Sequence, residues 1–189
     1  VEVGDPGDDA GGERDQATEQ LIGGQCVLQQ GEAGAWLVEP DWAHPHVFSP
    51  GRYPAPVASR YSGRYQFTRH YFAVLADLKD GGEEFQCAQL IDRHPKVRQW
   101  VRNLDTAPCG FALPTSRGRF FADFVAELVD GRVALLEYKG DHIQNPYQTE
   151  KHHVGALWAQ ASAGKAVFGW LTRQQDGKSL AQQLDTVLA

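Results

Sequence analysis

The chain has 189 residues, 42% of them hydrophobic, including five Trp, nine Phe and six Tyr. This length and composition suffice for one buried core, so we expect one main domain. No apolar run is long enough to span a membrane and no signal-like leader is present, which excludes a membrane function and favours a cytoplasmic location.

The net charge of −6 is concentrated in one segment. Residues 1–20 contain seven acids and one arginine, so this segment accounts for the whole excess. Its Gly- and Asp-rich composition predicts a flexible acidic tail. In contrast, residues 50–120 contain eleven Lys or Arg against six acids, which is compatible with contacts to phosphates as well as with a solvated surface.

Three cysteines are spread over the chain: Cys26, Cys87 and Cys109. Their odd number and wide spacing argue against a disulfide framework and against a structural zinc site. We expect them to be small core residues.

The elements before the midpoint are predicted from residue type and periodicity. Residues 21–60 contain short possible strands and many prolines, so an irregular lead-in is expected before a folded domain at 61–189. Residues 63–78 are rich in aromatic and β-branched residues and predict one or two strands. Residues 83–104 have apolar positions at helical spacing, and Pro95 suits a first helical turn, so two consecutive helices are expected to meet near His94.

The second half predicts a meander followed by a helix and a strand. The expected strands are 110–113, 119–128 and 132–138, and a helix at 148–161, a strand at 165–172 and a last helix from Ser179 follow. This order indicates an α/β fold with a central mixed sheet flanked by helices.

The hairpin at 120–140 has charges inside runs that otherwise suit burial. Asp123 lies in the first run, and Glu137 and Lys139 lie in the second. Asp130 and Gly131 mark the turn, and Gly131 can adopt the left-handed conformation. If both strands were solvent-exposed edge strands, these charges would need no function.

The pairing register decides where the charges meet. A two-residue turn would place Phe124 opposite Glu137 and mix charge into the apolar face. A three-residue loop at 129–131 instead pairs Phe124 with Leu136 and places Asp123 opposite Glu137, and a bulge near Asp123 would have the same effect. Burial favours this second register, in which all three charges converge.

Carboxylates that lie opposite each other repel and destabilise a sheet. A nearby lysine offsets part of this repulsion, but a divalent cation offsets it better, and oxygen ligands on two strands suit Mg²⁺, with Mn²⁺ as an alternative. The Lys139 amine is then placed to orient or deprotonate a water and to stabilise charge on a phosphoryl group. The pattern predicts a hydrolase of phosphodiesters.

Asp123 followed by Glu137-Tyr138-Lys139 across a hairpin resembles the PD-(D/E)XK nuclease superfamily, with Ala122 where the usual Pro stands. EEFQCAQLIDRHPKVRQWVRNLD, FALPTSRGRFFADFVAEL, LLEYKGDH and EKHHVGALWA together resemble the C-terminal endonuclease domain of the large (Res) subunits of type III restriction enzymes, over about 61–171. The resemblance implies a restriction-endonuclease-like fold and a Mg²⁺-dependent DNA endonuclease that serves restriction and phage defence.

The resemblance also implies roles for single residues. Those implied for metal binding and catalysis are Asp123, Glu137, the backbone carbonyl of Tyr138, and the catalytic lysine Lys139. Glu84, or its neighbour Glu83, would add a catalytic carboxylate from the preceding helix, although acids are also favourable at any helix N-terminus. Contacts to DNA are expected from Lys151, Arg119 and Arg117. Nearby histidines lack a metal-binding pattern and are expected to be structural or solvated: His142, His152 and His153.

Type III large subunits drive cleavage with an ATP-dependent helicase motor, yet no GxxxxGK[ST] phosphate loop is present. The motor is therefore expected on another part of the same polypeptide or on a partner chain, or it is missing. The resemblance implies DNA, a helicase motor and a DNA-recognition or methyltransferase subunit as partners. Two alternatives stay open: a catalytically idle nuclease-fold module for DNA docking or complex assembly, and a hairpin whose charges are only structural.

Overall fold

The computed structural model describes residues 21–30, 36–49, 53, 59–105, 110–140 and 146–189, so the acidic tail lies outside the described residues. Four strands form the central sheet in the order β3 (Val97–Arg102), β6 (Phe124–Leu128), β7 (Val133–Lys139) and β8 (Ala166–Thr172). The pairs β3–β6 and β6–β7 are antiparallel, whereas β7–β8 is parallel. The sheet is therefore mixed, as predicted.

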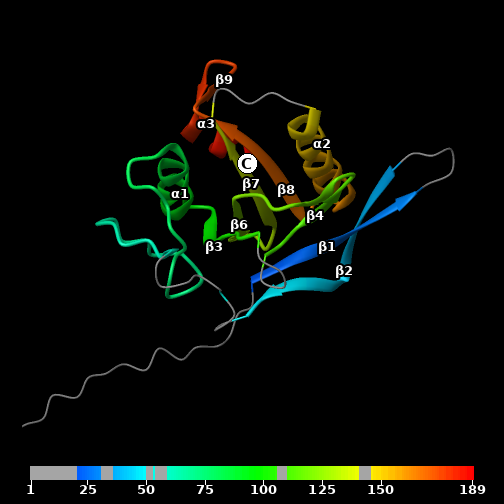
Figure 1. Cartoon of the computed structure of the whole chain (residues 1–189), viewed down its shortest axis with the longest axis horizontal. Coiled ribbons are helices and arrows are strands. Elements are labelled where there is room, and N and C mark those ends of the chain that lie inside the picture. Colours follow the sequence, from blue (N-terminus) through cyan, green and yellow to red (C-terminus); the bar gives the residue numbers. More distant parts are fainter. Residues whose placement is uncertain (1–20, 31–35, 50–52, 54–58, 106–109, 141–145) are drawn as a thin grey trace, which may run out of the picture.

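Helices cover both faces of this sheet (Figure 1). They are α1 (Glu83–Arg93), α2 (Pro146–Ala161) and α3 (Leu180–Val187). One core cluster packs α1 and α3 against Phe124 and Leu136, and a second packs α2 against Val125 and Leu135. The predicted α/β architecture with a helix-flanked sheet is thus confirmed. Among the described helices, none has the length and apolar character needed to cross a membrane.

Strand β7 is the centre of the fold. Its residues 133–138 are all buried, because helices cover both faces of the sheet at this strand. Such a strand is normally a continuous apolar run. Glu137 interrupts that run although it is only 2% exposed, so its carboxylate requires partners inside the protein.

The hairpin between β6 and β7 has the predicted register. Phe124 pairs with Leu136, and Ala126 pairs with Ala134. The Leu128 N–H donates to the Arg132 carbonyl at 2.8 Å, which leaves a three-residue loop at 129–131. Gly131 adopts a φ of +86°, as the predicted left-handed position requires.

One predicted helix is a strand. Residues 83–93 form α1, but the second helix expected after His94 is replaced by β3, which pairs with β6 through Arg102 and Phe124. Val97, Trp100 and Val101 also fit helical spacing, which led to the wrong prediction. Short apolar runs are ambiguous in this way, and here the ladder to a central strand decides the conformation.

The one or two strands expected at 63–78 are also not formed. Isolated bridges occur instead, and one joins His70 to Trp100 of β3. Asp92 of α1 holds this segment, because its carboxylate accepts the backbone N–H groups of Thr68 and Arg69, and it also accepts the indole N–H of Trp100 at 2.9 Å. Satisfied side-chain bonds therefore replace a sheet ladder.

A small hairpin lies where a strand of the central meander was expected. Strands β4 (Leu113–Thr115) and β5 (Gly118–Phe120) pair only with each other, so the central meander begins with β3 rather than with 110–113. The strand expected at 119–128 is likewise divided into β5 and β6, and Asp123 lies just before β6.

The lead-in contains regular structure, contrary to the prediction of an irregular segment. Strands β1 (Leu21–Gln30) and β2 (Trp36–Phe48) form a long antiparallel hairpin with a register shift between Gly23 and Gln25. Figure 1 shows this hairpin beside α2 and β4. Phe48 joins the core cluster under α2 and Trp42 stacks on Trp158, so the hairpin packs against the domain.

The C-terminal elements agree with the predictions. The expected helix at 148–161 and the expected strand at 165–172 correspond to α2 and β8. The short strands β9 (Gln174–Gln175) and β10 (Lys178–Ser179) lead into α3. Ser179 caps α3, since its hydroxyl accepts the Gln182 N–H while the Gln182 side chain accepts the Ser179 N–H.

Candidate active site

Asp123 and Glu137 meet at the end of the β6–β7 hairpin that lies away from its turn. The Asp123 N–H donates to Oε2 of Glu137 at 3.1 Å, and the Tyr138 N–H donates to Oδ2 of Asp123 at 2.7 Å. Each carboxylate thus accepts a backbone N–H from the neighbouring strand segment. The predicted convergence of these two acids on one site is confirmed.

Lys139 completes the cluster from the same strand as Glu137. Residues two apart on a strand share a face, and the Lys139 Nζ lies 2.6 Å from Oε1 of Glu137. The same Nζ lies 5.7 Å from the centre of the Trp170 ring. The ammonium therefore lies between the buried carboxylate of Glu137 and the aromatic ring of Trp170.

Burial raises the pKa of both acids. Burial, then the charges of Glu137 and Glu84, raises the pKa of Asp123 to about 7. Burial also raises the pKa of Glu137, although the charges of Lys139 and Lys151 oppose this shift. Two acids whose ionised forms are unfavourable in the folded protein are typical of functional sites, and a bound cation would relieve the strain on both.

Glu84 lies near this pair but is engaged elsewhere. It occupies the first turn of α1, and its Oε2 accepts a hydrogen bond from Nη1 of Arg102 at 3.0 Å. Its charge acts on Asp123, yet no hydrogen bond joins it to either acid among the described residues. Glu83 lies beside the end of β7, since a Cβ at Gly140 would be 3.4 Å from its Oε2. The structure brings both α1 acids near the site without placing them in it.

The three residues predicted to contact DNA are only partly brought together. Lys151 on α2 is close enough to lower the pKa of Glu137, and its Nζ lies 4.8 Å from the Tyr147 ring centre. Arg117 lies against the same ring at 5.8 Å. Arg119 is exposed on β5 and has no ion pair or ring contact within the described part of the chain.

The nearby histidines behave as expected where the structure describes them. The His152 ring packs edge-on against Trp170 at 5.3 Å, and His153 is exposed. His142 lies outside the described residues. No group of three or more His, Cys, Asp or Glu that suits a metal ion is found among the residues that the structure describes.

The sequence did not identify two residues that the structure adds to the site. Trp170 of β8 pairs in parallel register with Glu137, and Arg102 at the end of β3 neutralises Glu84. The register of a parallel crossover is not readable from residue pattern, and Arg102 was assigned to a helix. No sequence signal singles out either residue.

The donor set fits a hard divalent cation. Asp123 and Glu137 offer carboxylate oxygens on adjacent strands, and burial, joined at Asp123 by the charge of Glu137, makes the ionised form of each acid less favourable. Mg²⁺ binds one or two carboxylates and keeps several waters. The chemistry and placement of these oxygens therefore match the expected metal better than zinc, which prefers nitrogen and sulfur ligands.

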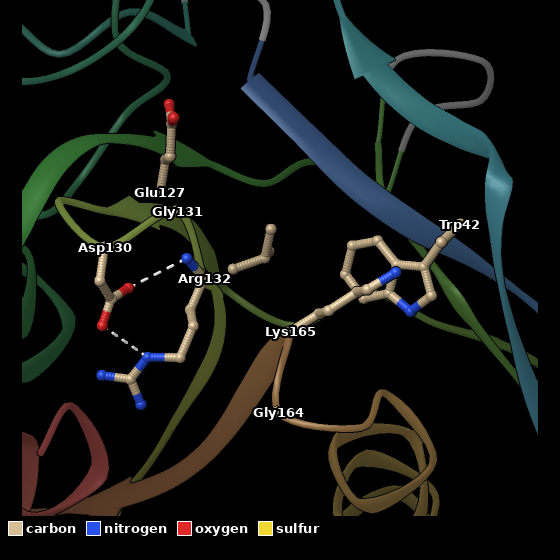
Figure 2. A pocket seen from close by; sticks show the side chains of 8 residues that line it. Trp42, Glu127, Asp130, Gly131, Arg132, Gly164 and Lys165 are labelled. Atoms are coloured by element: carbon tan, nitrogen blue, oxygen red, sulfur yellow. Dashed lines mark hydrogen bonds and ion pairs between the residues drawn. The ribbon is translucent and has the colours of Figure 1, made fainter.

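A pocket of about 400 Å³ lies at the opposite end of the same hairpin (Figure 2). Its lining includes Trp42, Asp130, Arg132 and Lys165. Arg132 binds Asp130 through Nε at 2.7 Å, and Lys165 lies over the Trp42 ring at 5.7 Å. These charges are largely satisfied, so this pocket lacks the electrostatic strain of the carboxylate pair.

Known proteins offer no match to this chain. No protein-family model matches it, and neither does any curated protein or solved structure. The geometry of Asp123, Glu137 and Lys139 is thus the ground on which a function can be inferred.

Proposed function

We propose that this protein is a metal-dependent nuclease that hydrolyses phosphodiester bonds in DNA. The observation that carries the proposal is the contact among the buried Glu137, the half-buried Asp123 and Lys139: the Asp123 N–H donates to Glu137 at 3.1 Å, and the Lys139 Nζ lies 2.6 Å from Glu137. A structural hairpin would have little reason to retain two acids with raised pKa values side by side at one end.

The order of elements supports the same proposal. Helix α1, the meander β3–β6–β7, helix α2 and the parallel strand β8 follow one another as in the restriction-endonuclease-like fold that the sequence resembles. Asp123 lies directly before the second strand of that meander, and Glu137 and Lys139 lie in the third. Ala122 in place of the usual Pro is buried and leaves the hydrogen bonds of Asp123 in place.

In the proposed reaction, Asp123, Glu137 and the Tyr138 carbonyl would hold Mg²⁺. When bound, Mg²⁺ supplies positive charge for the phosphate and lowers the pKa of water. The Lys139 ammonium donates hydrogen bonds to the attacking water or to a phosphate oxygen, and it stabilises the negative charge that develops there. Glu137 orients Lys139 through their 2.6 Å contact.

A plasmid-cleavage assay tests the proposal. We expect wild-type protein to nick or cut plasmid with Mg²⁺ or Mn²⁺ and to be inactive in EDTA. Asp123→Ala and Lys139→Ala should lose activity by at least about 100-fold, whereas Asp130→Ala, at the other end of the hairpin, should not.

Two results would decide against catalysis by this cluster. Cleavage that survives both Asp123→Ala and Lys139→Ala would show that another site or a contaminant is responsible. Wild-type protein that binds DNA but does not cut it, with and without a helicase motor and ATP, would favour an idle docking module instead.

A further inference from the structure

We propose that the β4–β5 hairpin binds the backbone of a nucleic-acid strand next to the candidate active site. Glu150 is the residue that positions the tip of this hairpin. The inference rests on the proposed nuclease function and names its substrate class, a polynucleotide rather than a small phosphodiester. The position of the hairpin, its attachment to α2 and the cations at its tip carry the argument.

The hairpin is anchored close to the acids. Phe121 and Ala122 alone separate β5 from Asp123, so the chain passes directly from the hairpin into the site. Leu113 and Phe120 at the base of the hairpin are fully buried in the core cluster under α2. The base is therefore rigid, while the tip projects toward the solvent.

One carboxylate, that of Glu150 on α2, binds the tip of the hairpin. The Ser116 N–H donates to Oε1 of Glu150, and the Ser116 hydroxyl donates to Oε2 at 2.9 Å. Gly118 follows with a φ of +133°, a value that side chains other than glycine rarely adopt. This two-point attachment holds Arg117, the other residue of the loop, on the α2 side.

Two cations flank one aromatic ring at this junction. The Arg117 guanidinium lies 5.8 Å and the Lys151 ammonium 4.8 Å from the centre of the Tyr147 ring. Within the described part of the chain, neither forms an ion pair with an acid. The Lys151 ammonium also lies 5.3 Å from the centre of the Phe120 ring, at the end of β5 and three residues before Asp123, so the two cations lie between the tip of the hairpin and the site.

A nucleic-acid strand fits the two cations and the Tyr147 ring, because it is a polyanion whose bases can stack on aromatic rings. Phosphates beside Lys151 and Arg117 would each be neutralised by one cation, and a base can stack on the Tyr147 ring. Backbone contacts of this kind position a strand without reading its sequence. A small diester that reaches only Lys139 would gain nothing from the hairpin.

The decisive variants are Arg117→Ala and Glu150→Ala. Binding of a labelled DNA oligonucleotide is measured in EDTA over a range of salt concentrations, and hydrolysis of bis(p-nitrophenyl) phosphate is measured with Mn²⁺. We expect Arg117→Ala to weaken DNA binding about three- to tenfold and to lower the salt slope by about one. Hydrolysis of the small diester should change less than DNA binding does. Arg93→Ala is the matched control, since Arg93, the last residue of α1, also lies against an aromatic ring, that of Tyr65, at 4.9 Å.

Glu150→Ala separates positioning from simple charge. Removal of an acid beside DNA would strengthen binding if only charge mattered. We expect weaker binding instead, because the tip that carries Arg117 loses its attachment. Glu150→Gln, which can still accept hydrogen bonds, should restore most of the affinity. Melting temperatures, with Ser116→Ala as a milder variant, show whether the hairpin remains folded.

The outcomes distinguish this inference from the nuclease proposal. Unchanged affinity and salt slope for Arg117→Ala, or tighter binding by Glu150→Ala, overturn the role of the hairpin even if wild type cuts DNA. Wild-type protein that hydrolyses neither substrate overturns the nuclease function, and the binding measurements in EDTA still decide the role of the hairpin.

Discussion

Both ends of the β6–β7 hairpin carry an aspartate, but its pKa is lowered at the turn and raised at the other end. At the turn, Asp130 and Arg132 pair at 2.7 Å with side chains 47% and 23% exposed. The Arg132 N–H, followed by the Arg132 side chain, lowers the pKa of Asp130. At the other end, burial and a neighbouring acid raise the pKa of Asp123.

This contrast shows what distinguishes a candidate site from a charged surface. An exposed ion pair near a turn contributes little to stability and needs no ligand. Two acids held together in the interior cost free energy, which a bound cation would recover. The same strands therefore provide both the site and its internal control, and the following predictions compare the two ends.

The largest expected effect is on cleavage. Glu137→Gln keeps the shape of the side chain but removes the charge that orients Lys139 and binds the metal in the proposed mechanism. We expect cleavage to fall by at least about 100-fold. Glu127→Gln, on β6 near the turn, should leave the rate within about twofold, since Glu127 pairs with Arg98 and Gln99 away from the site. Equal losses in both variants would remove the distinction between the ends.

A smaller effect is expected on stability, measured by urea unfolding in EDTA at acid and alkaline pH. The folded-state pKa of Asp123 is raised from 3.8 to about 7, so its contribution to stability is fully present below about pH 4 and is lost as the pH rises through 7. Asparagine does not ionise, so the Asp123→Asn variant does not lose this stability as the pH rises. We expect the variant to exceed wild type by on the order of 2 kcal/mol at pH 8, with the partial exposure of Asp123 discounted.

The sign of that difference is specific to the buried end. Near pH 4 the gap between Asp123→Asn and wild type should close. Asp130→Asn should show the opposite trend, because a lowered pKa contributes stability above the unfolded value that is lost on acidification. A gap for Asp123→Asn that does not change with pH would contradict the raised pKa.

The smallest expected effect concerns the turn. Gly131→Ala places a Cβ at a φ of +86° with no heavy atom within 4 Å, so only backbone strain opposes it. We expect a loss of about 1 kcal/mol in the free energy of unfolding. Cleavage should be retained, because the register is also held by the pairs inside both strands. A loss of cleavage with an intact fold would mean that the turn controls the site directly.

The contact between Asp123 and Glu137 was more predictable from sequence than much of the fold. Burial of Phe124 and Leu136 on one face leaves one acceptable register, and that register places Asp123 against Glu137. The helix predicted at 97–102 was wrong because the apolar spacing of this segment fits a helix and a strand equally well, and the partner strand β6 lies over twenty residues away in the chain. Non-local pairing of this kind is decided by tertiary structure rather than by local pattern.

The side-chain contacts could not be predicted from the sequence for a similar reason. The attachment of Ser116 to Glu150 joins residues 34 positions apart, and the pairing of Glu84 with Arg102 depends on a strand that was expected to be a helix. Each contact requires the packed arrangement of α1, α2 and the sheet. The charge of each residue was visible in the sequence, but its partner was not.

The most direct test of the central claim is a Mn²⁺ titration followed by electron paramagnetic resonance. We expect wild-type protein and Asp130→Asn to bind Mn²⁺ with the same affinity, and Asp123→Asn and Glu137→Gln to lose this binding. If Mn²⁺ bound equally well to all four proteins, Asp123 and Glu137 would not form a metal site, and the proposed nuclease mechanism would be contradicted.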